Sequence, residues 1–398
     1  MAKIMVIAGG DWQIELIKKA KKMGHTVLCS NLYENSPAFP YSDYCEIANV
    51  LDKEKNLKIA RKYNPDAVIS DQSDIAVPTV AYLNEQLGLQ GIGTKLASLF
   101  SDKSQQRIFC KAHSICVPDF RLCSSWQDAA LFLKNYPKAI IKPIDSQSSR
   151  GVFTVESEDD IKLHYEETLS WSNVRKEFLI EQYVGGDEFT IDGLVVNGRY
   201  HPMTVSIKEM YEQNPNVSKM QTYSYIHSKY DYNALREENR KLIETAGIPF
   251  GLTHSEYKCE NGKFYLIESG ARGGGSNLSG KIVPYMSDID NYEYLIRQAL
   301  GEKVEQPVFD KGYLENHYSI MRFFDFGKGK VKSVSGREFL EQIPNMIDFQ
   351  LNVKPGQVLE DLRYGRMRPG HFIIGGTDFE KLQEQMKIII DNVNVDFE

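Results

Sequence analysis

The chain of 398 residues contains no apolar run near the roughly 18 residues that a membrane-spanning helix needs. Its first residues, MAKIMVIAGG, pass directly into a strand-like segment without a signal-peptide cleavage site, so we expect a cytoplasmic protein without a membrane partner. The six cysteines are scattered and form no CxxC pair. Their spacing therefore argues against a zinc ribbon or a disulfide framework.

The chain also lacks an excess of positive charge. It carries 47 Lys and Arg against 54 Asp and Glu, a formal charge of −7. Such a balance gives no global basic field for a nucleic acid, so we expect no nucleic-acid partner. Hydrophobic residues at 42% and charged residues at 25% are close to the average for folded proteins. At about 150 residues per domain, the length predicts two to three domains.

The first hundred residues alternate between strand and helix patterns. Short apolar runs at 3–8, 26–30 and 66–70 are separated by helical patterns at 14–24, 56–64 and 78–88. This alternation predicts a parallel sheet covered by helices on both faces. The turn Gly9-Gly10-Asp11 is not a GxGxxG fingerprint, so an NAD-dependent oxidoreductase is poorly supported.

The rest of the chain has the pattern of α+β structure. Apolar strands surround two Asn-Gly dipeptides, Asn197-Gly198 and Asn261-Gly262, which are strong hairpin signals. A last block from about Gly312 contains short strands followed by an amphipathic helix, FEKLQEQMKIIIDNV. We expect this block to form a small third domain.

An ordered set of charged motifs is the most informative feature. Along the chain these are Lys103 in SDKSQQR, Lys142 in IIKPIDSQSSRGV, Glu181 in EQYV, Glu256 and Glu268 beside a hairpin turn, and Arg272 in ESGARGGG. The order resembles the ATP-grasp superfamily, in its biotin carboxylase, carbamoyl phosphate synthetase and purine-ligase branch. SSRGV and ESGARGGG are most similar to the amino-acid ligases of that branch.

The resemblance implies an ATP-grasp fold of mixed α/β and α+β class with three parts. These are an N-terminal Rossmann-like pre-ATP-grasp domain at 1–100, an ATP-grasp domain at 101–311 with a lid at about 125–185, and a C-terminal α+β domain at 312–398. ATP is the implied nucleotide.

Phosphate binding is the first chemistry that the motifs support. A nucleoside triphosphate brings about four negative charges, which lysines on separate elements can meet. Lys103 and Lys142 fit that role. The serine-rich loop after Lys142 can close backbone N–H groups and hydroxyls over the phosphates; its candidate residues are Ser146, Ser148, Ser149 and Gly151. Alone, such a loop is more often an ordinary hairpin tip.

Base and sugar recognition are implied by the resemblance. In the family, the first and fourth residues of the EQYV segment meet the adenine amino group and ring nitrogen. Glu181 is then the acceptor, and Val184 supplies a backbone N–H. Glu188 matches the position that binds the ribose hydroxyls.

A metal site is predicted from the second Asn-Gly hairpin. A turn at Asn261-Gly262 places Glu256 opposite Glu268, and two opposed carboxylates repel unless a cation lies between them. Oxygen ligands beside phosphates suit Mg²⁺, with Mn²⁺ as an alternative. Many family members have Asn two residues after the second carboxylate, whereas this chain has Gly270, so we expect water as the ligand there. Arg272 is the implied cation beside the transferred phosphoryl group.

Other polar residues are candidates for the substrate pocket. Residues near the carboxyl ends of the first sheet's strands lie where open α/β sheets bind ligands: Gln13, Asp71, Gln72, Ser73 and Asp74. His254 shares a sheet face with Glu256, although a structural histidine is the favoured interpretation. The Tyr-rich run 210–230 is expected to contribute specificity loops.

The motifs together predict an ATP-dependent carboxylate-amine ligase that forms an amide through an acylphosphate. Its partners are a small-molecule acid and amine, including amino acids, and a homodimer stays open. The nearest alternative is a purine-pathway ligase, carboxylase or carbamoyl phosphate synthetase-like enzyme. Biotin is not implied, because the carrier motif MKM is absent. A catalytically silent nucleotide-binding protein is a third hypothesis, but none of the predicted metal or phosphoryl-binding residues is missing.

Overall fold

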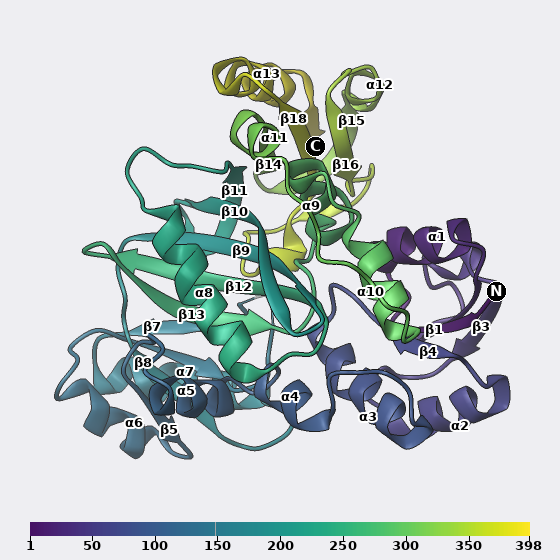
Figure 1. Ribbon diagram of the computed structural model, residues 1–398. Coiled ribbons are helices and arrows are strands. Elements are labelled where there is room, and N and C mark those ends of the chain that lie inside the picture. The colour runs from purple at the N-terminus through teal and green to yellow at the C-terminus, as the bar shows by residue number, and fades with distance from the viewer. Residues whose placement is uncertain (148) are drawn as a thin grey trace.

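The N-terminal region is a parallel sheet between helices (Figure 1), in a computed structural model that describes residues 1–147 and 149–398. Its strand order is β3-β2-β1-β4. The strands are β1 (Lys3–Ile7), β2 (Thr26–Asn31), β3 (Tyr44–Ile47) and β4 (Ala67–Ile69), and the helices are α1 (Ile14–Lys22), α2 (Lys53–Tyr63) and α3 (Val77–Leu87). The predicted parallel sheet is confirmed.

One face of this sheet is completed by a helix from much later in the chain. Helix α10 (Asn291–Ala299) packs beside α1, and the two share one hydrophobic core with β1. The N-terminal region is therefore fixed directly to the central region rather than held by a linker.

The segment predicted as a lid forms a separate antiparallel sheet with the order β5-β8-β6-β7, and we use the name lid for this sheet and its helices. After α4 (Thr94–Leu99) and α5 (Lys103–Ala112) come its strands β5 (Phe120–Cys123), β6 (Ala139–Pro143), β7 (Phe153–Val155) and β8 (Phe178–Gln182). Helices α6 (Trp126–Leu133) and α7 (Glu158–Ser170) cover the sheet and share its core. The predicted strand–loop–strand at 138–155 is confirmed by the pairing of β6 with β7.

The central element is an eight-stranded sheet with the order β13-β12-β9-β10-β11-β14-β18-β16. Its strands are β9 (Asp187–Val196), β10 (Arg199–Tyr211), β11 (Asn214–Tyr223), β12 (Gly251–Glu260), β13 (Lys263–Gly270), β14 (Tyr318–Phe323), β16 (Met346–Leu351) and β18 (Gly370–Gly376). Helix α8 (Tyr232–Ala246) packs on it. Both Asn-Gly pairs have positive φ at each residue, as a two-residue hairpin turn requires, so both hairpin predictions are confirmed.

The C-terminal region continues this sheet. Strand β14 pairs with β11, where Met220 lies opposite Arg322. The remaining elements are α9 (Val283–Ser287), α11 (Lys311–Asn316), α12 (Arg337–Glu341), α13 (Phe379–Asn392) and a small sheet of β15 (Gly329–Ser335), β17 (Val358–Leu359) and β19 (Asn394–Phe397). Much of the Tyr-rich run is thus not a loop, because residues 214–223 form an interior strand. No described helix is long and apolar enough to span a membrane.

Candidate active site

A cleft of about 290 Å³ lies between the lid and the central sheet; we name it the lid cleft. It gathers most of the residues predicted to bind nucleotide or metal: Lys103, Lys142, Ser149, Glu181, Val184, Glu188, Glu256 and Glu268. A neighbouring inner cavity of about 200 Å³ shares Glu188, Glu256 and Glu268 with it and adds Arg272. The structure therefore brings these predicted residues together around two adjoining cavities.

Lys142 lies in a buried cluster with two other charged side chains. Its Nζ is 2.6 Å from Glu181 Oε2, and Arg107 Nε donates to Glu181 Oε1 at 2.7 Å. Burial lowers the pKa of Lys142 to about 8, against the opposing effect of Glu181. Burial alone would raise the pKa of Glu181, but Arg107 and Lys142 outweigh it and hold that pKa below its usual value.

The contacts of Glu181 in this cluster differ from those predicted for the adenine segment. The Glu181 carboxylate is engaged by two cations and is almost fully buried, so its observed contacts position Lys142. Adenine recognition at Glu181 and Val184 stays a prediction. Arg107 was not predicted, although its place one turn after Lys103 on α5 put it on the same helix face.

A β-bulge in the metal hairpin connects it to this cluster. Tyr257 pairs with Leu266, but Glu256 pairs with Glu268, which leaves Ile267 without a partner in the ladder. The Ile267 carbonyl instead accepts from Arg107 Nη2 at 2.5 Å and from Lys142 Nζ at 3.5 Å. The bulge therefore places the two carboxylates opposite one another, and their predicted pairing is confirmed.

Each of the two paired carboxylates contacts a lysine. Glu256 Oε1 lies 2.8 Å from Lys208 Nζ, which also contacts Glu188 at 2.7 Å. Glu268 Oε1 lies 2.7 Å from Lys103 Nζ. Burial would raise the pKa of Glu256, but Lys208 and His254 hold it well below its usual value. Lys208 was not predicted, because its partners lie on two other strands.

The donor set can be compared with what a divalent ion requires. In the part of the chain that is described, no group of three or more His, Cys, Asp or Glu side chains is placed to hold a metal. Mg²⁺, however, commonly uses only one or two protein carboxylates together with phosphate and water. Glu256 and Glu268 share the lid cleft and are both ionisable oxygen donors, so they fit that ion.

Arg272 follows β13 and is held by the N-terminal region. Its Nε and Nη2 donate to the two oxygens of Asp74, both at 2.7 Å. A side chain at Gly270 would have its Cβ 2.9 Å from Asp74 Oδ1 and 3.4 Å from Arg272 Nε. A side chain at residue 270 would therefore crowd this ion pair.

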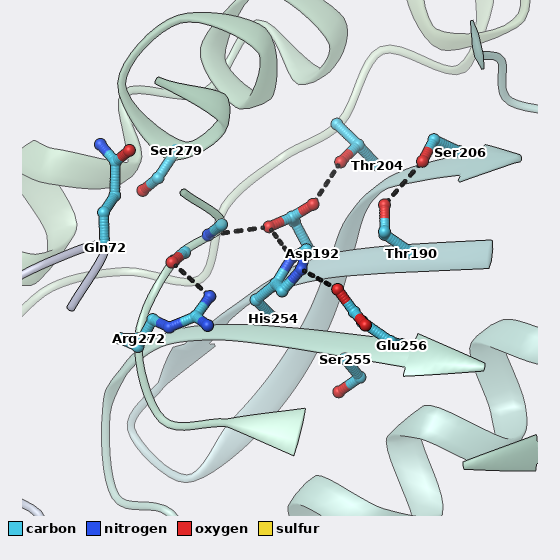
Figure 2. Close-up of polar contacts among 12 residues, drawn as sticks. Gln72, Thr190, Asp192, Thr204, Ser206, His254, Ser255, Glu256, Arg272 and Ser279 are labelled. Atoms are coloured by element: carbon cyan, nitrogen blue, oxygen red, sulfur yellow. Dashed lines mark hydrogen bonds and ion pairs between the residues drawn. The ribbon is translucent and has the colours of Figure 1, made fainter. Parts of the chain in front are cut away.

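A chain of polar contacts connects the loop that follows Arg272 with Glu256 (Figure 2). Asp192 Oδ1 accepts from the Gly274 N–H at 3.1 Å and contacts His254 Nδ1 at 2.9 Å, and His254 Nε2 is 3.6 Å from Glu256 Oε1. Burial lowers the pKa of His254, but the carboxylates of Asp192 and Glu256 outweigh burial and raise that pKa to about 9. His254 thus links the loop after Arg272 to Glu256.

Part of the serine-rich loop lies at the two cavities. Ser149 lines both cavities, and its Oγ donates to the Asn216 carbonyl at 2.9 Å; the Ser146 carbonyl accepts from Lys103 Nζ at 2.6 Å. Gly151 does not line the lid cleft. Its φ of +69° and the nearness of Trp171 to any Cβ explain the glycine structurally. Ser148 lies outside the described residues.

The substrate-pocket candidates separate into three groups. Gln72 and Asp74 line the inner cavity. Gln13 and Ser73 line an outer cavity of about 580 Å³ beside the N-terminal sheet, which Gln72 also reaches. Asp71 is completely buried, where it accepts from the Gly273 N–H and the Tyr292 hydroxyl, and burial raises its pKa. Asp71 is therefore a structural contact between regions.

Comparison with known families agrees with this geometry. Residues 135–279 match the model of the ATP-grasp domain, and residues 322–398 match L-amino acid ligase C-terminal domain 2. Alanine–anticapsin ligase of Bacillus subtilis is 26% identical over 289 residues, covering 66% of this chain and 59% of that protein. Formate-dependent phosphoribosylglycinamide formyltransferase of Prochlorococcus marinus (strain MIT 9515) is 24% identical over 195 residues, covering 48% of this chain and 50% of that protein.

Among solved structures, L-amino acid ligase from Bacillus licheniformis superimposes with a TM-score of 0.83 at 18% identity, covering 100% of this chain and 99% of that one, which shows a shared fold. The chain spans about half the length of the curated relatives it matches. The predicted resemblance is confirmed by the two matched domains and by the fold. The chain therefore combines an ATP-grasp domain with a C-terminal domain of the L-amino acid ligase type.

Proposed function

We propose that the protein is an ATP- and Mg²⁺-dependent ligase that joins a small carboxylic acid to an amine through an acylphosphate. The observation that carries this proposal is the placement of Glu256 and Glu268 where the lid cleft and the inner cavity meet, with Arg272 beside them in the inner cavity. A phosphoryl donor in the lid cleft and an acceptor in the inner cavity would face each other across these side chains. Such an arrangement favours phosphoryl transfer by positioning and charge neutralisation.

The lid cleft would hold the nucleotide. Lys103 and Lys142 would contact its phosphates, the Val184 N–H and Glu181 would face the adenine edge, and Glu188 would face the ribose. Arg107 would act indirectly, because its contacts fix Glu181 and the Ile267 carbonyl around Lys142.

Glu256 and Glu268 would hold Mg²⁺, which neutralises phosphate charge when it is bound. Each carboxylate now has a lysine ammonium beside it, and Mg²⁺ would take the place of that contact. Arg272 would then stabilise the charge on the transferred phosphoryl group and on the acylphosphate. Asp74 holds that guanidinium in place.

The match of residues 322–398 to the L-amino acid ligase C-terminal domain favours amino acids among the substrates. The similarity to a formyltransferase that is named as formate-dependent supports a second candidate, in which the acid is formate or another very small carboxylate. Both candidates share the acylphosphate step and differ in the acid.

The proposal is tested by following ADP and phosphate release from ATP with pools of carboxylic acids, with and without hydroxylamine. Hydroxylamine converts an acylphosphate into a hydroxamate that mass spectrometry identifies, so the acid is found without knowledge of the amine. Amines, including amino acids, are then added to the productive acid, and formate and bicarbonate form separate arms.

We expect Mg²⁺-dependent hydroxamate formation with at least one acid, and none with Glu268→Gln. ATP should be preferred to GTP, whose six-position carries an acceptor where adenine carries a donor. Absence of hydroxamate with every acid would contradict the ligase proposal, and equal affinity for GTP would contradict the adenine assignment.

A further inference from the structure

A small cavity of about 60 Å³ lies at the contact between the N-terminal and central regions, and we name it the interface cavity. It follows the free edge of β4, which is the last strand of the first sheet. Helices α3 and α10 both contact β4 (Figure 1), and the start of β12 lines the cavity as well. Among the described residues, the interface cavity shares Arg272 with the inner cavity and no residue with the lid cleft or the outer cavity.

The wall of the interface cavity is mainly apolar. Its buried apolar residues belong to three separate hydrophobic clusters: Leu252, Leu295 and Ala299 to one, Val68 to another, and Val77 and Ala81 to the third. The cavity is the space left where these clusters meet. An occupant would therefore have apolar neighbours on several sides, and removing its apolar surface from water would favour binding.

Asn84 on α3 places an unpaired hydrogen-bond acceptor in this wall. Its side chain is 3% exposed, and its Nδ2 donates to the Val68 carbonyl at 3.1 Å. A Cβ at Gly91 would lie 2.8 Å from the same nitrogen. Oδ1 therefore points away from both Val68 and Gly91, and no donor within the described residues reaches it. Because the Val68 carbonyl can only accept, exchanging the two amide atoms would break the one bond that this side chain makes.

The other polar side chains of the wall are already engaged. Ser70, Asp71 and Arg272 each hydrogen-bond within the protein, and Gln90 is exposed to solvent. Asn84 Oδ1 is thus the one buried side-chain polar atom of the described wall without a partner. A buried acceptor without a donor is costly. The chemistry that this wall lacks is a single hydrogen-bond donor.

We propose that the interface cavity binds a small uncharged molecule with an apolar body and one O–H or N–H donor, as a short branched alcohol or a phenol has. The donor hydrogen-bonds to Asn84 Oδ1, and the body fills the apolar space between α3 and α10. Water suits the space less well, because buried water usually makes about three hydrogen bonds and apolar cavities stay dry. A charged molecule would find Asp71 and Arg272 already paired. The site is separate from the lid cleft, so its ligand is not a reactant of the proposed ligase reaction.

The test measures binding by fluorine NMR on the full chain, with two probes of matched shape. Para-fluorophenol carries the donor, para-fluorotoluene has a methyl group in its place, and isobutanol is an unlabelled aliphatic competitor. Ala81→Leu fills the cavity from α3, and Asn84→Leu removes the acceptor at similar size. Gln86→Leu is the matched control, because it adds the same side chain at an exposed position of the same helix.

We expect para-fluorophenol to bind the parent at least as tightly as the more apolar para-fluorotoluene, and isobutanol to displace it. Asn84→Leu should shift the ratio of the two dissociation constants about tenfold toward para-fluorotoluene, as loss of one buried hydrogen bond does. Continued binding of para-fluorotoluene to Asn84→Leu would show that the cavity is intact in that variant. Ala81→Leu should lose both probes, and Gln86→Leu should bind them like the parent.

The proposal is overturned if neither probe binds the parent, if the ratio of dissociation constants is the same in Asn84→Leu, or if Ala81→Leu binds both probes like the parent. Circular dichroism shows whether each variant is folded. If Ala81→Leu does not fold, Ala299→Val fills the cavity from α10 and gives the same comparison. A crystal of the parent soaked with para-fluorophenol should show the probe beside Asn84, and a probe bound only in the lid cleft would reject the site.

Discussion

Arg272 and Asp74, 198 residues apart in sequence, form a two-point ion pair with both N–O distances at 2.7 Å. Burial alone would raise the pKa of Asp74, but Arg272 outweighs burial and holds it below its usual value. The pair connects the 3-10 turn Asp74–Ala76 of the N-terminal region with the end of β13. A cation expected to act on the phosphoryl group is therefore oriented by another region of the chain.

Removing this guanidinium should lower turnover and spare nucleotide binding. We expect Arg272→Ala to reduce kcat about 10²- to 10³-fold, because it removes a donor needed mainly in the transition state. KM for ATP should change little, since Arg272 lines the inner cavity rather than the lid cleft. Steady-state kinetics with the productive acid checks this, with Lys142→Ala as the contrasting variant that raises KM for ATP. Unchanged kcat in Arg272→Ala would exclude its catalytic role.

The space beside the ion pair leads to a second prediction. Gly270→Ala should destabilise the fold by about 1–3 kcal/mol, because its Cβ would lie 2.9 Å from Asp74 Oδ1. Gly275→Ala is the matched control, since its Cβ would meet nothing closer than Trp12 at 3.6 Å. Urea denaturation measures both.

A second substitution tests whether crowding at Asp74 causes the loss of stability in Gly270→Ala. Combining Gly270→Ala with Asp74→Ala should recover part of the loss relative to the sum of the single variants, because the crowded oxygen is gone. Strict additivity would show that crowding at Asp74 is not the reason for the glycine.

The sequence predicted the elements that depend on local signals. The alternating pattern of the first region and the two Asn-Gly hairpins follow from side chains within a few residues of one another. The pairing of Glu256 with Glu268 also needs the bulge at Ile267, because an unbroken ladder would pair Glu256 with Ile267. Strand β11 was not recognised, because Asn214, Pro215 and Lys219 interrupt any apolar alternation. Its place is set by β10 and β14, a long-range pairing that no single segment encodes.

The site residues also divide into those with a local sequence signal and those whose position depends on long-range contacts. Motif order predicted Lys103, Lys142 and the two carboxylates, which line one cleft, but it indicated neither Arg107 nor Lys208. Each of the missed side chains owes its position to partners on other elements: Arg107 on α5 reaches β8 and the bulge of β13, and Lys208 on β10 reaches β9 and β12. Such convergence becomes visible only when the elements are assembled.

The carboxylate pair gives a prediction that a thermal shift can test. With Mg²⁺-ATP at a hundredfold excess over Kd, the parent should gain on the order of 2.7 kcal/mol. Glu268→Gln should lose most of this gain, because it removes a charge and a metal ligand at nearly constant volume. The ligand-free variant should lose at most about 1 kcal/mol, since the Lys103–Glu268 contact is partly exposed.

Glu237→Gln is the control for that experiment. Glu237 is an exposed residue of α8 whose contact is the neighbouring Arg240, so its substitution should leave the gain from Mg²⁺-ATP intact. If Glu268→Gln gains as much from Mg²⁺-ATP as the parent and Glu237→Gln do, the metal site is not at this carboxylate.

ATP binding should depend on pH through Lys142, whose pKa burial lowers to about 8. The ammonium form is the one that attracts phosphate, so Kd for ATP should be constant below pH 7 and should rise about tenfold per unit well above pH 8. The free energy of unfolding should change in the opposite direction. Between the folded pKa of about 8 and the ordinary lysine pKa of 10.5, the unfolded chain binds more protons, so this group favours folding as pH rises. Lys142→Arg keeps its charge throughout this range and should give a flat Kd profile between pH 7 and 9.5. Calorimetry or fluorescence titration decides the matter: a flat profile in the parent, or the same slope in Lys142→Arg, would show that Lys142 does not control nucleotide affinity by its charge.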